Sequence, residues 1–162
     1  MYGVAESMVG QKVPDIRLPA SNGEELALTD FKGQMVVLYF YPRDMTPGCT
    51  TEACDFRDQH PRLSQLGVQV IGVSPDDVKS HHKFIEKHRL PFILLSDPDH
   101  QLAEYFQVWV KKKMYGREYM GIERSTFLID PEGTIIKEWR KVKVKGHVDE
   151  VVHTVEELVH PN

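Results

Sequence analysis

Apolar positions in this chain form short runs that alternate with more polar, helix-compatible stretches. Three runs have the near-continuous apolar character of buried strands: residues 35–41, 68–73 and 92–95. Residues 50–66 and 75–88 lie between these runs and are predicted to be helices. Pro61 falls inside the first of them, where the missing backbone N–H predicts a kink or a break.

The two ends of the chain carry hairpin and helix signals. Residues 13–18 and 25–28 predict a short hairpin that turns at Gly23. Further signals are a short helix in residues 97–106, a hairpin of residues 125–129 and 134–139, and an amphipathic helix in residues 147–159. This order predicts an α/β fold with a mixed sheet and helices on both faces. With no repeat or linker, we expect residues 1–162 to form one domain.

Composition narrows the functional classes. The formal net charge of −4 argues against nucleic-acid binding, and we interpret Lys111, Lys112 and Lys113 as a solvated loop. No apolar run approaches the roughly 20 residues of a membrane span, and the first residues lack the pattern of a secretory signal. We therefore expect a cytoplasmic protein, in whose reducing compartment a close cysteine pair is more often catalytic or metal-binding than a permanent disulfide.

The two cysteines are the strongest chemical signal. Cys49 is expected in the first turn of a helix that follows a strand, where the helix dipole favours a thiolate. On one helix, Cys54 would lie about 8 to 9 Å away between Cα atoms, whereas a disulfide needs about 4.4 to 6.8 Å. A bond between them would therefore require unwinding, which suits a catalytic cycle or a switch.

The remaining polar residues decide between a metal site and a reactive thiol. A zinc site would need two more ligands, and the eight histidines are expected to be mostly surface residues. Charge on a reacting sulfur could instead be stabilised by the Thr46 hydroxyl and by N–H groups at the helix start. Pro42 would hold the preceding turn rigid. Arg43 and Arg57 are near in sequence, but Arg124, at the edge of a strand, is the better candidate cation.

These residues match a known pattern. Pro42-x-x-x-Thr46-x-x-Cys49, with Arg124 before residues 125–130, resembles the active-site pattern of peroxiredoxins, and residues 41–54 with Cys54 are similar to the Q-type group, the bacterioferritin comigratory proteins. The resemblance implies a thioredoxin-like fold of the peroxiredoxin type, thiol-specific peroxidase activity on hydrogen peroxide and organic hydroperoxides, and no cofactor or metal. It also implies thioredoxin or a similar dithiol as the reductant, and it favours a monomer, with a dimer as the alternative.

The resemblance also implies a role for each site residue. Cys49 would attack the peroxide and become a sulfenic acid, which Cys54 would resolve to a disulfide. Thr46 would hydrogen-bond the peroxide, Arg124 would stabilise the thiolate and the developing charge, and Pro42 would shield the pocket from water. Two further expectations concern other residues: a supporting hydrogen-bonding role for Glu52, and a position for Trp109 either on a flap near the site or in the core.

Other interpretations of the same cysteines stay open. Cys54 could be a small buried residue, with an external thiol resolving Cys49. The protein could also be a peroxide-responsive redox sensor that passes its disulfide to a partner, although a slow sensor would not require Thr46 and Arg124. A protein disulfide oxidoreductase is disfavoured because the chain lacks a Cys-x-x-Cys motif.

Overall fold

The computed structural model describes residues 6–160, which fold around a five-stranded mixed sheet with the strand order β5-β4-β3-β8-β9. Its strands are β3 (Met35–Phe40), β4 (Val68–Ser74), β5 (Ile93–Ser96), β8 (Ser125–Ile129) and β9 (Ile135–Trp139). β3, β4 and β5 are parallel, while β8 runs antiparallel to both β3 and β9. The sequence-based prediction of an α/β fold with a mixed sheet is therefore confirmed.

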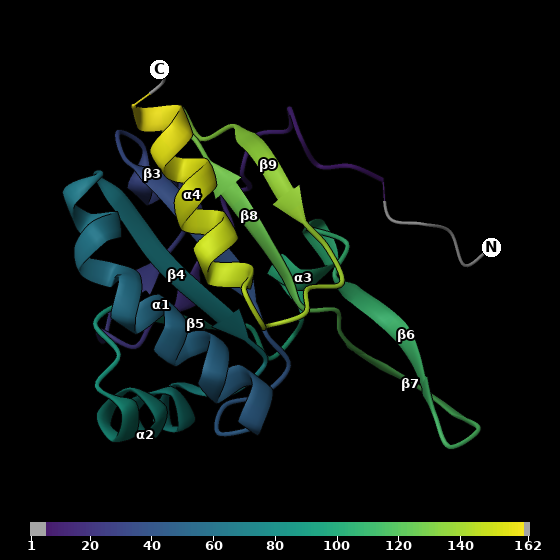
Figure 1. Cartoon of the computed structure of the whole chain (residues 1–162). Coiled ribbons are helices and arrows are strands. Elements are labelled where there is room, and N and C mark those ends of the chain that lie inside the picture. The colour runs from purple at the N-terminus through teal and green to yellow at the C-terminus, as the bar shows by residue number, and fades with distance from the viewer. Residues whose placement is uncertain (1–5, 161–162) are drawn as a thin grey trace.

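The central strand β3 divides the core into two layers. Because successive side chains of a strand point to opposite faces, Val36, Leu38 and Phe40 pack into one cluster and Val37 and Tyr39 into the other. The helices are η1 (Leu28–Phe31), α1 (Pro47–Gln65), α2 (Val78–His88), α3 (Gln101–Tyr105) and α4 (His147–Val159). α3 packs on the first face, whereas α1, α2 and α4 contribute to the second; α1 and α4 lie together on it in Figure 1.

Helix α1 differs from its prediction at two points. It begins at Pro47 rather than at Thr50, since proline is well suited to the first turn, where its missing N–H would have no partner. It also continues unbroken through Pro61 to Gln65, so the prediction of a break at Pro61 is wrong. The buried side chain of Leu63 packs the last turns into the core, and this packing offsets the cost of the proline.

The lysine-rich segment is a strand, not a loop. β6 (Trp109–Met114) contains Lys111–Lys113 and pairs antiparallel with β7 (Arg117–Ile122), forming a hairpin that projects from the body in Figure 1. The turn residues Tyr115 and Gly116 have φ values of 51° and 78°, the left-handed pair of a tight hairpin turn. The prediction failed because the side chains of this hairpin are mostly exposed, so no alternation of apolar and polar residues marks it.

The other elements agree with their predictions to different extents. The amino-terminal hairpin is shorter than expected, with β1 (Leu18–Pro19) paired to β2 (Glu25–Leu26) and Gly23 at a φ of 87°. The β8–β9 hairpin and α4 are confirmed. Between residues 6 and 160 no helix has the length and apolar character needed to cross a membrane.

Candidate active site

Cys49 lies where β3 is connected to α1. The chain leaves the sheet after Phe40, passes through a short loop and enters the helix with Thr46 as the N-cap residue. Cys49 is in the first turn and only 1% exposed. The first N–H groups of a helix have no partner within it and carry the positive end of its dipole. The thiol therefore sits against a site that stabilises negative charge.

Arg124 bridges Cys49 and a buried carboxyl group. It lies between β7 and β8, and its Nη2 donates to Cys49 Sγ at 3.2 Å while its Nη1 donates to Glu52 Oε1 at 2.6 Å. Gly48 lies against this guanidinium, because a Cβ atom there would be 3.3 Å from Nη2 of Arg124, closer than most van der Waals contacts, and would press on it. The fixed positive charge expected from Arg124 is thus in direct contact with the sulfur, and the supporting hydrogen bond expected of Glu52 is present.

Burial and charge act in opposite directions on this pair. Burial raises the pKa of Glu52 to about 7, although Arg124 opposes the rise. For Arg124, burial would lower the pKa, but Glu52 and Cys49 outweigh it and the pKa is raised. Within residues 6–160, Oε2 of Glu52 and the hydroxyl of Tyr39 are buried without a hydrogen-bond partner. Arg124 therefore keeps its charge beside a carboxyl group that titrates near neutrality.

Thr46 and Pro42 belong to the loop between β3 and α1 that precedes Cys49. The Thr46 hydroxyl donates to the carbonyl oxygen of Arg43 at 2.9 Å, which orients the hydroxyl oxygen and leaves its lone pairs available to accept a hydrogen bond. Pro42 is half-buried in the loop directly after β3. Arg43 is exposed, so proximity in sequence does not bring its guanidinium into the buried site.

Cys54 lies further along the same helix, facing α2. It is half-buried, and its Sγ is 3.9 Å from Nδ1 of His88 at the end of α2. Arg57, the other cation considered from sequence, donates to the His88 carbonyl oxygen at 2.8 Å. Both cysteines are free thiols on one continuous helix. The condition for a bond that requires unwinding is therefore met.

Several buried polar residues near the site have no signal in the sequence. His81 and His147 are buried, contrary to the expectation of surface histidines. His81 contacts Asp44 in the loop before α1, and His147 Nε2 lies 2.8 Å from the Thr126 hydroxyl. Nothing in the local sequence separates these histidines from exposed ones. In the described part of the chain, no group of three or more His, Cys, Asp or Glu residues is placed to hold a metal ion.

Trp109 also has a defined position. It is half-buried at the start of β6, and its ring stacks on His100 with a centroid separation of 3.6 Å. Its side chain packs against the core cluster that contains Leu102 and Ala103 of α3. Trp109 therefore lies at the edge of the core, which agrees better with the predicted core position than with a flap near the site.

Comparison with known proteins identifies the family. The sequence model of the AhpC/TSA family matches residues 9–138. The chain belongs to the AhpC/TSA family. Peroxiredoxin Bcp of Bacillus subtilis is 61% identical over 150 residues, which are 93% of this chain and 96% of that protein. Peroxiredoxin Bcp of Escherichia coli K12 is 45% identical over 148 residues, covering 91% and 95% of the two chains.

Solved structures of this family share the fold. The bacterioferritin comigratory protein of Xanthomonas campestris, studied for alkyl peroxide reduction, superposes with a TM-score of 0.88 at 42% identity and covers 93% of this chain and 99% of its own. A cysteine-to-serine mutant of Xylella fastidiosa PrxQ gives a TM-score of 0.91 at 39% identity, with 97% and 100% covered. This AhpC/TSA chain is thus a Q-type peroxiredoxin with a thioredoxin-like fold, and the predictions of fold, family and peroxidase activity are confirmed.

Proposed function

We propose that Cys49 is the residue that reduces hydroperoxides in this peroxidase. Its thiolate attacks the terminal oxygen of the peroxide, forming an S–O bond as the O–O bond breaks. The leaving alkoxide or hydroxide takes up a proton and departs as alcohol or water, and Cys49 is left as a sulfenic acid. The observation that carries this proposal is the contact of 3.2 Å between Arg124 and Cys49 Sγ in a buried site at a helix start.

Arg124, Thr46 and Pro42 act on the same step. Arg124 holds the thiolate and stabilises the charge that moves onto the leaving oxygen. The Thr46 hydroxyl is held at the helix N-cap by its bond to a backbone carbonyl, and it hydrogen-bonds the peroxide there. Pro42 covers one side of the loop and excludes water from the sulfur. Glu52 touches only Arg124 in this set and is a positioning residue for its guanidinium.

Cys54 resolves the sulfenic acid. After the start of α1 unwinds, the Cys54 thiol attacks the sulfur of Cys49, so that an S–S bond forms and the hydroxyl group leaves as water. Thioredoxin or a similar dithiol then reduces this disulfide, is itself oxidised, and restores both thiols. The position of both cysteines on one helix supports a conditional bond, because five residues of helix separate them by about 7.5 Å along its axis.

The proposed cycle also bears on domain organisation, cellular compartment and oligomeric state. We infer one domain over residues 1–162, since the described strands of the main sheet draw on segments from Met35 to Trp139 and α4 packs back against α1. A reducing cytoplasm fits a disulfide that is formed and reduced in each cycle. A monomer suffices for this cycle, because both thiols come from one chain.

The test is peroxide-dependent NADPH consumption in the presence of thioredoxin and thioredoxin reductase. Wild type should turn over hydrogen peroxide and an organic hydroperoxide steadily, Cys49→Ser should be inactive, and Cys54→Ser should lose most of its turnover. Cys54→Ala is the matched variant, since it also removes the thiol. Normal turnover by both Cys54 variants would refute the resolving role. A single oxidation of wild type without recycling would favour the sensor.

A further inference from the structure

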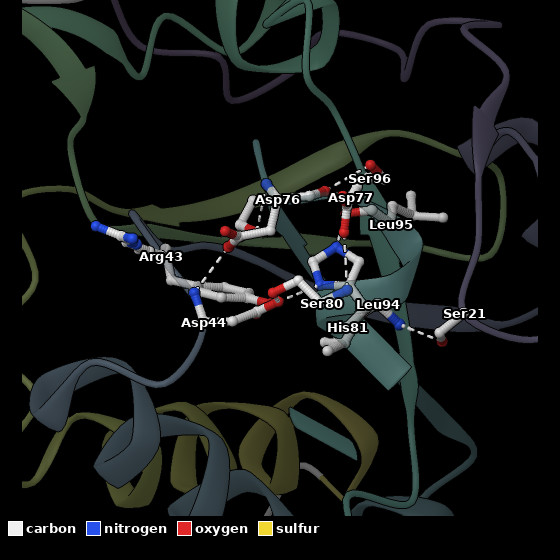
Figure 2. Close-up of polar contacts among 12 residues, drawn as sticks. Ser21, Arg43, Asp44, Asp76, Asp77, Ser80, His81, Leu94, Leu95 and Ser96 are labelled. Atoms are coloured by element: carbon white, nitrogen blue, oxygen red, sulfur yellow. Dashed lines mark hydrogen bonds and ion pairs between the residues drawn. The ribbon is translucent and has the colours of Figure 1, made fainter. Parts of the chain in front are cut away.

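A buried polar cluster connects the loop that leads into α1 with helix α2 (Figure 2). Its centre is the carboxyl group of Asp44, which is 5% exposed. Oδ1 accepts a hydrogen bond from the Tyr41 hydroxyl at 2.6 Å. Oδ2 accepts one from the Ser80 hydroxyl at 2.8 Å and lies 2.7 Å from Nδ1 of His81. Ser80 and His81 belong to α2, so this one side chain connects the loop before α1 to another helix.

Both ring nitrogens of His81 have partners. Nε2 lies 2.9 Å from the carbonyl oxygen of Leu95, which can only accept, so Nε2 carries a hydrogen. Nδ1 lies 2.7 Å from Oδ2 of Asp44 and joins the ring to the carboxyl group. Buried polar groups persist where they are hydrogen-bonded, and both ring nitrogens and both carboxyl oxygens meet this condition.

A second carboxyl group fixes the backbone of the same loop. The Asp44 N–H donates to Asp76 Oδ2 at 2.7 Å, and the Ser74 hydroxyl donates to the same oxygen at 2.7 Å. The carbonyl oxygen of Asp76 accepts a hydrogen bond from the hydroxyl of Ser96. These contacts tie the loop to the carboxyl ends of β4 and β5. We call Asp44, His81, Tyr41, Ser80 and Asp76 together the loop latch.

The latch holds a strained piece of backbone. Met45 follows Asp44 and has a φ of 68°, in the left-handed region that residues with a long side chain rarely adopt. Its side chain is 41% exposed, so packing of Met45 in the core does not fix the loop conformation. Strained conformations persist only where surrounding contacts determine them. Thr46, the next residue, is the N-cap of α1, so the strain lies immediately before the proposed peroxide-binding hydroxyl.

We propose that Asp44 and His81 are positioning residues that hold the Met45 loop, and with it Thr46 and the first turn of α1, in the conformation that reacts with peroxide. This proposal rests on the proposed function of Cys49 and Thr46. Since disulfide formation with Cys54 requires that turn to unwind, the latch opposes the second step while it supports the first. Weakening it should therefore slow oxidation of Cys49 and should not slow the formation of the disulfide.

Two substitutions of His81 separate its contacts. Asn places its amide near the position of Nδ1 and can keep the bond to Asp44, whereas Gln reaches toward the position of Nε2 and keeps the bond to Leu95. Each variant loses one hydrogen bond from the same buried site. Ser80→Ala is a milder variant, because it removes one donor to Asp44 from a half-buried position and keeps the backbone contact of Ser80 with Asp77.

The experiment follows one turnover of reduced protein mixed rapidly with hydrogen peroxide. Loss of the Cys49 thiol is measured by acid quench and alkylation, and the disulfide is measured by mass spectrometry. Misplacing a reacting geometry by about 1 Å can cost about a hundredfold in rate, so His81→Gln should oxidise about ten- to a hundredfold more slowly than wild type. His81→Asn, which can keep the bond to Asp44, should oxidise faster than His81→Gln, and Ser80→Ala, which removes one donor to Asp44, should fall between His81→Gln and wild type. Disulfide formation should be as fast as in wild type or faster.

Arg140→Gln is the control for a general loss of stability. Arg140 donates to the carbonyl oxygens of Phe106 and Gln107 in a half-buried site outside the latch. Equal oxidation rates in His81→Gln and wild type would overturn the proposal, as would a parallel loss of both steps matching Arg140→Gln. Should His81→Gln not fold, a Ser80→Ala variant that oxidises as fast as wild type, or that slows the second step rather than the first, would refute it. Failure of the proposed function itself would look different, because wild type would not oxidise at Cys49.

Discussion

Replacing Glu52 by glutamine should change how the stability of the fold depends on pH. Glu52 is completely buried in the first turns of α1, and its only hydrogen bond among the described contacts is the one from Arg124. Burial raises its pKa from an ordinary value of 4.5 to about 7. Glutamine has the same shape, keeps an oxygen for Arg124 and carries no titratable proton. The variant therefore isolates the effect of ionisation.

The sign and size of the effect follow from proton linkage. Below pH 4.5 the carboxyl group is protonated in both states, so it adds no difference between them. As the pH rises toward 7, the unfolded chain ionises first and unfolding becomes easier. At about 1.4 kcal/mol per pH unit of pKa difference, the ionised carboxylate costs the folded state about 3 kcal/mol. The stability of Glu52→Gln relative to wild type should rise by about that amount between pH 4.5 and pH 7.5.

The assay is urea unfolding of reduced protein at several pH values, read as the difference between variant and wild type. The difference is needed because His147 acts in the opposite direction: burial and then Arg124 lower its pKa from 6.5 to about 4, so its contribution is lost as the pH falls. The two effects largely cancel in the wild-type curve. Glu132→Gln removes an exposed carboxylate and is the matched control. A pH-independent difference for Glu52→Gln would refute the reasoning.

Three further outcomes test the site. Arg124→Lys should slow oxidation of Cys49 by about 10² to 10³, because one ammonium group cannot bond the sulfur and Glu52 as a planar fork does; stopped-flow measurement with Arg43→Lys as control decides this. Thr46→Val should slow the same step about ten- to a hundredfold through loss of one charge-assisted hydrogen bond, and recovery in Thr46→Ser would assign the effect to the hydroxyl. His147→Gln should gain about 3 kcal/mol over wild type as the pH falls from 6.5 to 4, since only the wild type must keep a neutral histidine. A curve for His147→Gln that follows the exposed-site control His160→Gln would contradict this last expectation.

The sequence predicts an element best where one physical rule dominates. The apolar run of β3 and the amphipathic pattern of α4 record burial directly, and both elements appear where expected. The β6–β7 hairpin was missed because its exposed faces leave no such record. Pro61 was misjudged because packing of the last turns of α1 outweighs a local preference, and no local pattern expresses that packing.

The site residues differ in the same way: those close in sequence can be predicted, whereas those brought together by packing cannot. Cys49, Thr46 and Cys54 lie close together in sequence, so their spacing could be interpreted directly. Arg124 was reached only through its place beside a strand and a family resemblance, yet it contacts Cys49. His81 could not be found at all, because its role depends on the packing of α2 against the loop before α1 and on a carboxyl group 37 residues away.

The distribution of polar and apolar contacts along α1 fits the two proposed steps, oxidation of Cys49 and formation of its disulfide with Cys54. Its first turns carry Cys49 and Glu52, whose polar contacts are with Arg124, whereas Phe56 and Leu63 are the large apolar side chains that anchor the rest in the core. A buried ion pair contributes little net stability after desolvation, while burial of large apolar side chains contributes about 1.5 to 3 kcal/mol each. The boundary between the two regions falls close to Cys54. Unwinding up to that residue would give up these polar contacts and the core packing of the small side chains of Cys49 and Ala53. It would leave Phe56 and Leu63 in place, which favours local opening of the helix over unfolding of the domain.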